Sequence, residues 1–166
     1  MNENLLEAFR HSAWATRTLV AACRQLSIEQ LKEPGRGFGS ILATLNHIVE
    51  CDAAYATIVV EEQPEWTADV REAEDLGEVE ARLEESHRLW ERLLAAPLDP
   101  ERLLLLDDGK YKCPVSVVIA QALHHANAHR EQVRARLADF EVRAPDVQPW
   151  AYAGETGRAT RTEKGQ

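Results

Sequence analysis

The sequence predicts an all-α fold, a four-helix bundle with a small β-hairpin before the last long helix. The chain has 166 residues, which is the length of one ordinary domain. Four segments of about 20 residues each carry apolar side chains along one stripe at helical spacing. One short segment before the last of them alternates like a pair of strands. An antiparallel or crossover bundle is the most economical way to bury the four stripes.

The first helix is expected over residues 4–26, where apolar side chains recur at spacings close to 3.6 without an interrupting Pro or Gly. The pattern ends near Gln25. Ser27 is then placed to cap a short turn that runs to Leu31. Residues 33–39 contain one Pro and three Gly, so we expect them to form a loop.

A second helix is expected over residues 41–62. Ser40 occupies the position of its N-cap, and Pro64 ends the pattern. The β-branched run at 57–60 is ambiguous by propensity, but its uninterrupted phase favours a helix. Residues 63–75 are polar and carry a Pro near their start, so they are expected to form a connection.

The third helix is expected over residues 76–96, capped by Asp75 or a neighbour and stopped by Pro97. Residues 103–115 differ in kind, because an apolar run is followed by an Asp-Gly pair and then by alternating side chains. This order is typical of a small β-hairpin.

The last long helix is expected over residues 115–140, opened by Pro114 or Ser116. Two further prolines break the pattern after it. A single domain is therefore expected over residues 1–153. Residues 154–166 are polar and rich in Gly, and we expect them to form a disordered tail.

Composition argues against several classes of partner. The chain has 19 Lys and Arg against 28 Asp and Glu, a net charge of −9 spread along its length, so no nucleic acid partner is expected. No apolar stretch approaches the roughly 18 residues of a membrane span, and the first residues do not resemble an export signal. Three scattered cysteines without a CxxC pair suit reduced thiols, so a soluble, cytoplasmic protein with no membrane partner is expected.

His125 and His129 are the first candidate metal ligands. Four residues apart on a helix, they lie about 6 Å apart along its axis and about 40° apart around it, so both imidazoles can converge on one ion. Such a pair also arises by chance. Both residues follow a stripe with Ala122, Val133 and Leu137, which predicts that they point to the bundle interior. Coordination or hydrogen bonding must then satisfy them.

His47, midway along the second helix, is the best third ligand. A single helical His is more often a core or surface residue, but three on two inward faces favour a metal site. One ligand would come from one helix and two from another, as in metal sites built inside bundles. The face of His47 carries small or apolar neighbours that let helices approach closely, namely Thr44, Cys51, Ala54 and Ile58.

The remaining chemically active residues are expected to lie outside the site. His124 is turned about 100° from its neighbour onto a more polar face and is expected at the surface. His87 is expected at the edge of the core with a hydrogen-bond partner, and His11 lacks ligand spacing. Cys51 could add a thiolate ligand or a nucleophile, although a free cysteine is more commonly a small buried hydrophobe. The Asp pair at 107–108 resembles turn residues, and no phosphate loop or serine nucleophile motif is found.

Three stretches resemble the motifs of the DinB/YfiT-like family, a group of proposed metalloenzymes. They are SILATLNHIVECDAAY at 40–55, HHANAHREQ at 124–132 and PDVQPWAY at 145–152. The order of the expected helices also resembles that family over nearly the whole chain.

The resemblance implies the same three ligands. In that family the first motif contributes one metal-binding His, matched here by His47, and the HxxxHR motif contributes two, matched by His125 and His129. One departure is Glu131, which stands where many members have Gly. The flanking Arg and Gln of the motif are kept.

The resemblance also implies a class of activity. Similar proteins include transferases and isomerases that use a low-molecular-weight thiol such as mycothiol or bacillithiol. A small-molecule substrate and a homodimer are therefore expected. Three histidine ligands favour a divalent metal ion, Zn or Ni, with the remaining positions open to water or substrate.

Three functional hypotheses stay open at this point. The first is an enzyme, in which the ion activates either a thiol for transfer or a water as in a metal-dependent hydrolase, although no general base is identified. The second is a non-catalytic helical dimer with a structural metal, but structural zinc usually has four protein ligands. The third is an interaction module in which the histidines form a metal-free hydrogen-bonded cluster.

Overall fold

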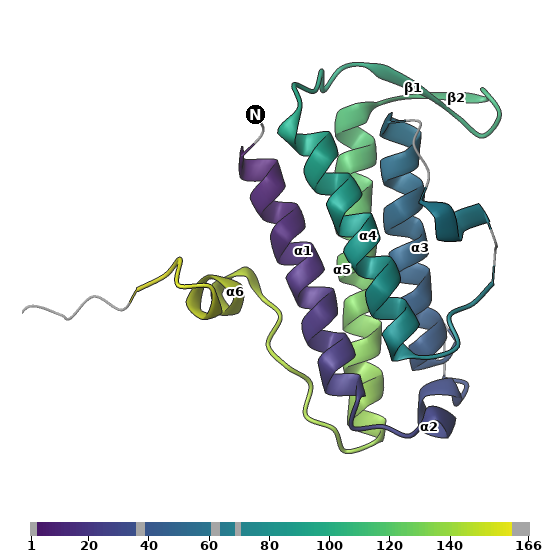
Figure 1. Ribbon diagram of the computed structural model, residues 1–166, viewed down its shortest axis with the longest axis vertical. Helices are drawn as coiled ribbons and strands as arrows, with labels where there is room; N and C mark the ends of the chain where they lie inside the picture. Colours follow the sequence, from purple (N-terminus) through teal and green to yellow (C-terminus); the bar gives the residue numbers. More distant parts are fainter. Residues whose placement is uncertain (1–2, 36–38, 61–63, 69–70, 161–166) are drawn as a thin grey trace, which may run out of the picture.

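The structure is a computed structural model that describes residues 3–35, 39–60, 64–68 and 71–160. Within them the chain forms six α-helices, one 3-10 turn and a two-stranded antiparallel sheet. Four long helices stand side by side, and the two strands lie across one end of them (Figure 1). The predicted all-α bundle with a hairpin before the last long helix is confirmed.

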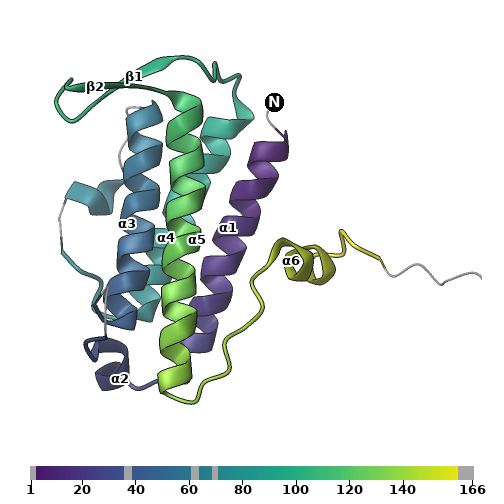
Figure 2. The same ribbon diagram turned by 180° about the vertical axis from the view of Figure 1, so that it is seen from behind.

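The direction of the four helices defines a crossover bundle. The helices labelled α1 and α5 run one way, and α3 and α4 run the other way (Figures 1 and 2). Both α1 and α3 pack against α4 and α5, so the parallel pair α3 and α4 needs a connection that returns along the bundle. The bounds are α1 (Glu3–Cys23), α3 (Ile41–Val60), α4 (Leu76–Ala95) and α5 (Val115–Asp139).

These bounds agree with the predicted helices to within three residues where the structure describes them. The last two residues of the expected second helix, 61–62, lie outside the described part, as do 36–38 of the expected loop. The short turn capped by Ser27 is the helix α2 (Ile28–Lys32). Its cap is reciprocal, because the Ser27 hydroxyl accepts from the Gln30 backbone N–H and the Gln30 amide oxygen accepts from the Ser27 backbone N–H. Within the expected connection, Glu65–Ala68 form the 3-10 turn.

The hairpin consists of β1 (Leu103–Leu106) and β2 (Tyr111–Pro114) in antiparallel register. Asp107, Asp108 and Gly109 all have positive φ, at 51°, 52° and 84°. Asp and Gly are among the residues that adopt this left-handed region most readily. The two aspartates are exposed turn residues, in agreement with their predicted role.

The short helix α6 (Pro149–Glu155) was not expected from the sequence. It packs against α1, where Trp14 Nε1 donates a hydrogen bond to the Glu155 carboxylate at 3.2 Å. An isolated helix this short is unstable in water, so its contacts with α1 rather than its own pattern hold it in place. The expected division after residue 153 stays a prediction, and residues 161–166 of the expected tail lie outside the described part.

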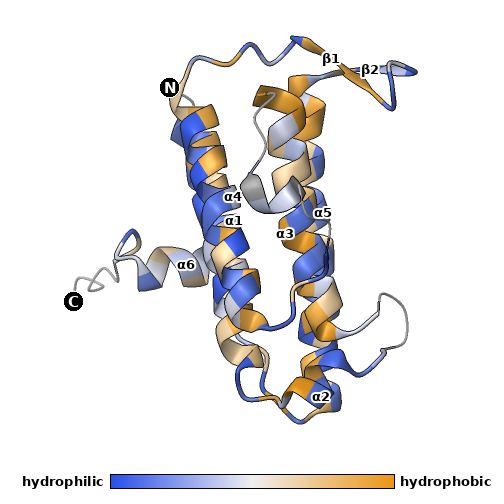
Figure 3. Cartoon of the chain, turned by 45° about the vertical axis from the view of Figure 1, so that its right-hand side comes forward, coloured by the Kyte–Doolittle hydropathy of each residue, from blue (hydrophilic) through white to orange (hydrophobic). Residues whose placement is uncertain are grey.

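The core is apolar and fills the centre of the bundle. Hydrophobic and hydrophilic residues alternate around the turns of the bundle helices (Figure 3). Phe9 of α1 stacks on Trp90 of α4, with ring centroids 4.0 Å apart. No helix in the described residues is both long and apolar enough to cross a membrane. Fully buried side chains from all four bundle helices include Leu19, Leu45, Ile48, Leu83 and Leu137.

Candidate metal centre

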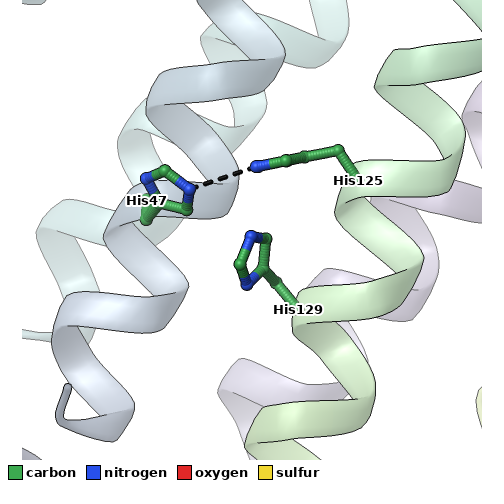
Figure 4. A group of neighbouring side chains, drawn as sticks. All are labelled: His47, His125 and His129. Carbon is green, nitrogen blue, oxygen red and sulfur yellow. Dashed lines mark hydrogen bonds between the residues drawn. The ribbon is translucent and has the colours of Figure 1, made fainter. Parts of the chain in front are cut away.

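The structure brings the three predicted histidines together. His47 projects from α3, and His125 and His129 project from α5, so that the three rings point toward one another (Figure 4). One ring nitrogen of each lies within 4.8 Å of the others. The Nε2 atoms of His47 and His125 are 3.1 Å apart, at hydrogen-bond distance.

The interior position expected for His129 is confirmed, whereas His47 and His125 sit nearer the rim of the α3–α5 interface. The buried stripe of α5 passes through Ala126 and Arg130. His129 is buried at 7% exposure, whereas His47 and His125 are only half-buried. Because α5 packs against both α1 and α3, Arg130 on one side of its buried face bonds to α1, and the histidines lie on the side that faces α3.

Two facing ladders of side chains account for the convergence. Successive members are four residues apart, so each ladder follows one face of its helix. Since α3 and α5 are antiparallel, the ladders face each other in reverse order, which puts the His47 ring opposite the two histidines of α5. The ladder of α3 is His47, Cys51 and Tyr55, and that of α5 is Gln121, His125 and His129.

Tyr55 and Gln121 are site residues that the sequence analysis missed. The Tyr55 ring stands edge-on to His125 with centroids 5.8 Å apart, and the Gln121 amide donates to the Tyr55 hydroxyl at 3.4 Å. Continuing the four-residue spacing from His47 and His125 by one step would have found both residues.

The imidazoles of His47 and His125 are held in their neutral form. Burial, and then the positive charges that His129, His47 and His124 would carry, lower the pKa of His125 to about 4. Burial and the neighbouring His129 likewise lower the pKa of His47, against the opposing effect of Glu50. A neutral imidazole keeps a lone pair, which metal coordination requires.

Cys51 contacts the site without joining the group of converging ligand atoms. Its Sγ lies 3.7 Å from both ring nitrogens of His47. The side chain is half-buried rather than fully buried as a small hydrophobe would be. Burial, and then the nearby carboxylates of Glu50 and Asp52, raise the pKa of the thiol to about 11. Cys51 is therefore a neutral thiol near pH 7, which does not suit a nucleophile.

The other histidines lie outside the group, as expected. His124 is exposed, and His87 Nε2 lies 3.8 Å from the Glu91 carboxylate. His11 Nε2 donates to the Val147 carbonyl at 2.9 Å.

A buried polar cluster behind the site was also missed. Arg130 is 2% exposed, and its Nη1 donates to the Ser12 carbonyl at 3.2 Å, the Ser12 hydroxyl at 2.9 Å and the Thr16 hydroxyl at 3.3 Å. Burial raises the pKa of Asp52 to about 7, and the charge of Arg130 opposes this shift. Arg130 directly follows His129, and a charged side chain beside a polar one adds nothing to a hydrophobic pattern that would predict burial. The sequence alone therefore does not reveal the cluster.

The donor set fits a divalent metal ion. Imidazole nitrogen suits Zn and Ni, and two ligands held at roughly 2.0 Å in a tetrahedron stand roughly 3.3 Å apart. The 3.1 Å between the Nε2 atoms of His47 and His125 is already close to this value. In the metal-free chain the same contact is a hydrogen bond that satisfies one nitrogen of each ring.

Comparison with known protein families matches residues 1–139 to the DinB family. A comparison with curated proteins found no match. The family match ends where α5 ends, and it includes all four bundle helices and the three converging histidines. On this match over most of its length, the chain belongs to the DinB family.

Proposed function

We propose that the protein is a metal-dependent enzyme acting on a small molecule, with one divalent ion, Zn or Ni, held by His47, His125 and His129. The observation that carries this proposal is the approach of three imidazole nitrogens from two helices to within 4.8 Å of one another. Three protein ligands leave a position open for a substrate, as in catalytic rather than structural zinc sites. The half-buried position of His47 and His125 keeps that side accessible.

The family resemblance favours an external, low-molecular-weight thiol as the sulfur nucleophile. When bound, a divalent ion supplies a Lewis acid that favours the deprotonated form of a thiol or of water at neutral pH. Cys51, whose thiol has a pKa of about 11, supplies no thiolate of its own near pH 7 in the metal-free chain. We therefore propose transfer or isomerisation with a low-molecular-weight thiol. Tyr55 and Gln121 border the site beside His125 and are placed to contact the substrate.

Metal content tests the first part of the proposal. Tag-free protein is supplemented with Zn or Ni, dialysed and subjected to elemental analysis. We expect about one ion per chain in the unmutated protein and a large loss in His125→Ala. His124→Ala is the matched control, because it removes the adjacent exposed imidazole that lies outside the converging group. Negligible metal in the unmutated protein would refute the proposal and favour a metal-free cluster.

Turnover tests the second part. Metal-loaded protein is offered a panel of low-molecular-weight thiols with electrophilic acceptors, and a separate panel of esters and amides. We expect thiol transfer that disappears in His47→Ala and on chelation. Rates on the thiol panel that match the metal-free background count against a transferase, and metal-dependent cleavage of the second panel would identify a hydrolase instead.

A homodimer completes the proposal, as the family resemblance implies. Sedimentation equilibrium of the full chain should give twice the mass of one chain. A single-chain mass at micromolar concentration would contradict it.

A further inference from the structure

Each neutral imidazole carries its proton on one nitrogen and can bind a metal only through the other. The protein must therefore determine which nitrogen is protonated in each of the three rings. In His129, Nδ1 lies 2.8 Å from Oε1 of Gln132. An amide oxygen accepts and never donates, so Nδ1 is the donor. The lone pair of His129 is then on Nε2.

The helix geometry explains this contact. Gln132 follows His129 by three residues on α5, and side chains at that spacing are neighbours on the helix surface. Gln132 is exposed, whereas His129 is the one buried member of the group. The His129 ring also stands edge-on to both other rings, with centroids 4.8 Å from His47 and 4.4 Å from His125. The contact with Gln132 and the contacts with the two other rings together fix the orientation of the His129 ring.

The other two rings contrast with His129. Because the Nε2 atoms of His47 and His125 lie 3.1 Å apart as a hydrogen-bonded pair, one of them must donate a proton to the other. One of these two rings therefore carries its proton on Nε2 in the metal-free chain, and that proton has to leave Nε2 before both nitrogens can act as ligands. His129 needs no such change.

We propose that Gln132 is a positioning residue that holds His129 in the Nδ1-protonated tautomer and so keeps Nε2 ready for the metal. The consequence for metal affinity rests on the proposed function, but the tautomer is a property of the metal-free chain. Groups that orient metal-binding histidines through their second nitrogen commonly change metal affinity by about 10- to 100-fold when they are removed.

Long-range ¹H–¹⁵N NMR spectra of the metal-free protein test the tautomer directly, because protonated and lone-pair ring nitrogens have distinct shifts. Spectra are recorded at a pH where the imidazoles are neutral. We expect one tautomer of His129, protonated at Nδ1, in the unmutated chain. Gln132→Leu, which has similar volume and no acceptor, should give a mixture or the Nε2-protonated form. Gln132→Glu keeps an acceptor and should restore the original tautomer.

A metal titration gives the second measurement. Zn or Ni affinity should fall about 10- to 100-fold in Gln132→Leu and be retained in Gln132→Glu. Gln25→Leu is the control for the same chemical change at an exposed residue in the turn after α1. A His129 tautomer that is unchanged in Gln132→Leu would overturn the inference. If the unmutated chain binds neither ion, the proposed function fails, whereas a Gln132-dependent tautomer would still support the role of Gln132.

Discussion

The three histidine rings converge on one point, but their burial and their hydrogen-bond partners differ. His129 is buried and bonded to Gln132, whereas His47 and His125 are half-buried and bonded to each other. Burial and repulsion from the neighbouring imidazoles lower the pKa of His47 and of His125, so the metal-free chain keeps these two rings neutral at the expense of stability in acid.

The lowered pKa of His125 predicts how the stability of the fold depends on pH. The pKa of His125 falls from an ordinary value of 6.5 to about 4 in the folded chain. Between these values the unfolded chain binds the proton and the folded chain does not, so stability is full above the upper value and is lost as pH falls toward the lower one. Urea unfolding of metal-free His125→Gln should therefore show a smaller loss of stability over this window. An identical pH dependence in the variant would contradict the assignment.

Individual residues differ in how far the sequence reveals them. The three candidate ligands follow from helical spacing, because i, i+4 histidines need only local geometry to lie on one face. The burial of Arg130 depends instead on hydroxyls of α1, which are more than a hundred residues away in the chain. No local pattern encodes such a partner.

At the scale of elements, the buried cluster links α1, α3 and α5 directly behind the site. Arg130 lies next to His129 in the chain and is bonded to two hydroxyls of α1, so it fixes the rotation of α5 relative to its neighbours. That rotation sets which face of α5 is turned toward α3 and His47.

Arg130→Met should destabilise the fold by about 1–3 kcal/mol, because it removes the donor to the buried Ser12 and Thr16 oxygens and the cation near the buried Asp52 carboxyl. Denaturant unfolding measures this loss. In an Asp52→Asn background the same substitution should be less costly, since the uncompensated carboxylate is gone. Equal losses in the two backgrounds would show that the two residues are not coupled.

Helices with long apolar stripes are predictable from sequence because the pattern extends over five or more turns. The predicted stripe of α5 is confirmed at most of its positions, whereas His125 lies at its edge and is only half-buried. The buried positions are Val118, Ala122, His129, Val133 and Leu137. The helix α6 was missed because it has only seven residues and depends on tertiary contacts with α1.

At the scale of the whole molecule, the crossover topology is what joins the two ladders. The pairing of α3 with α5 and of α1 with α4 is not encoded in any single stripe, because a stripe marks which face of a helix is buried and not which helix covers it. The sequence therefore allows antiparallel and crossover bundles, and the observed packing decides between them.

Metal binding should stabilise the whole bundle, because the three ligands converge only in the folded chain. A ligand at 100 times its Kd adds about 2.7 kcal/mol, which raises Tm by roughly 5–10 °C in a domain of this size. We expect this rise with Zn or Ni in the unmutated protein and in His124→Ala, and its loss in His47→Ala. An equal rise in His47→Ala would place the binding elsewhere.

The central claim is that one ion binds between His47, His125 and His129. Anomalous diffraction from crystals of the Zn- or Ni-loaded protein, recorded at the absorption edge of the metal, tests it most directly. We predict a peak roughly 2.0–2.1 Å from one nitrogen of each of the three rings. A peak bound to other residues, or none between the three rings in crystals of protein that was supplied with the metal, would contradict the account.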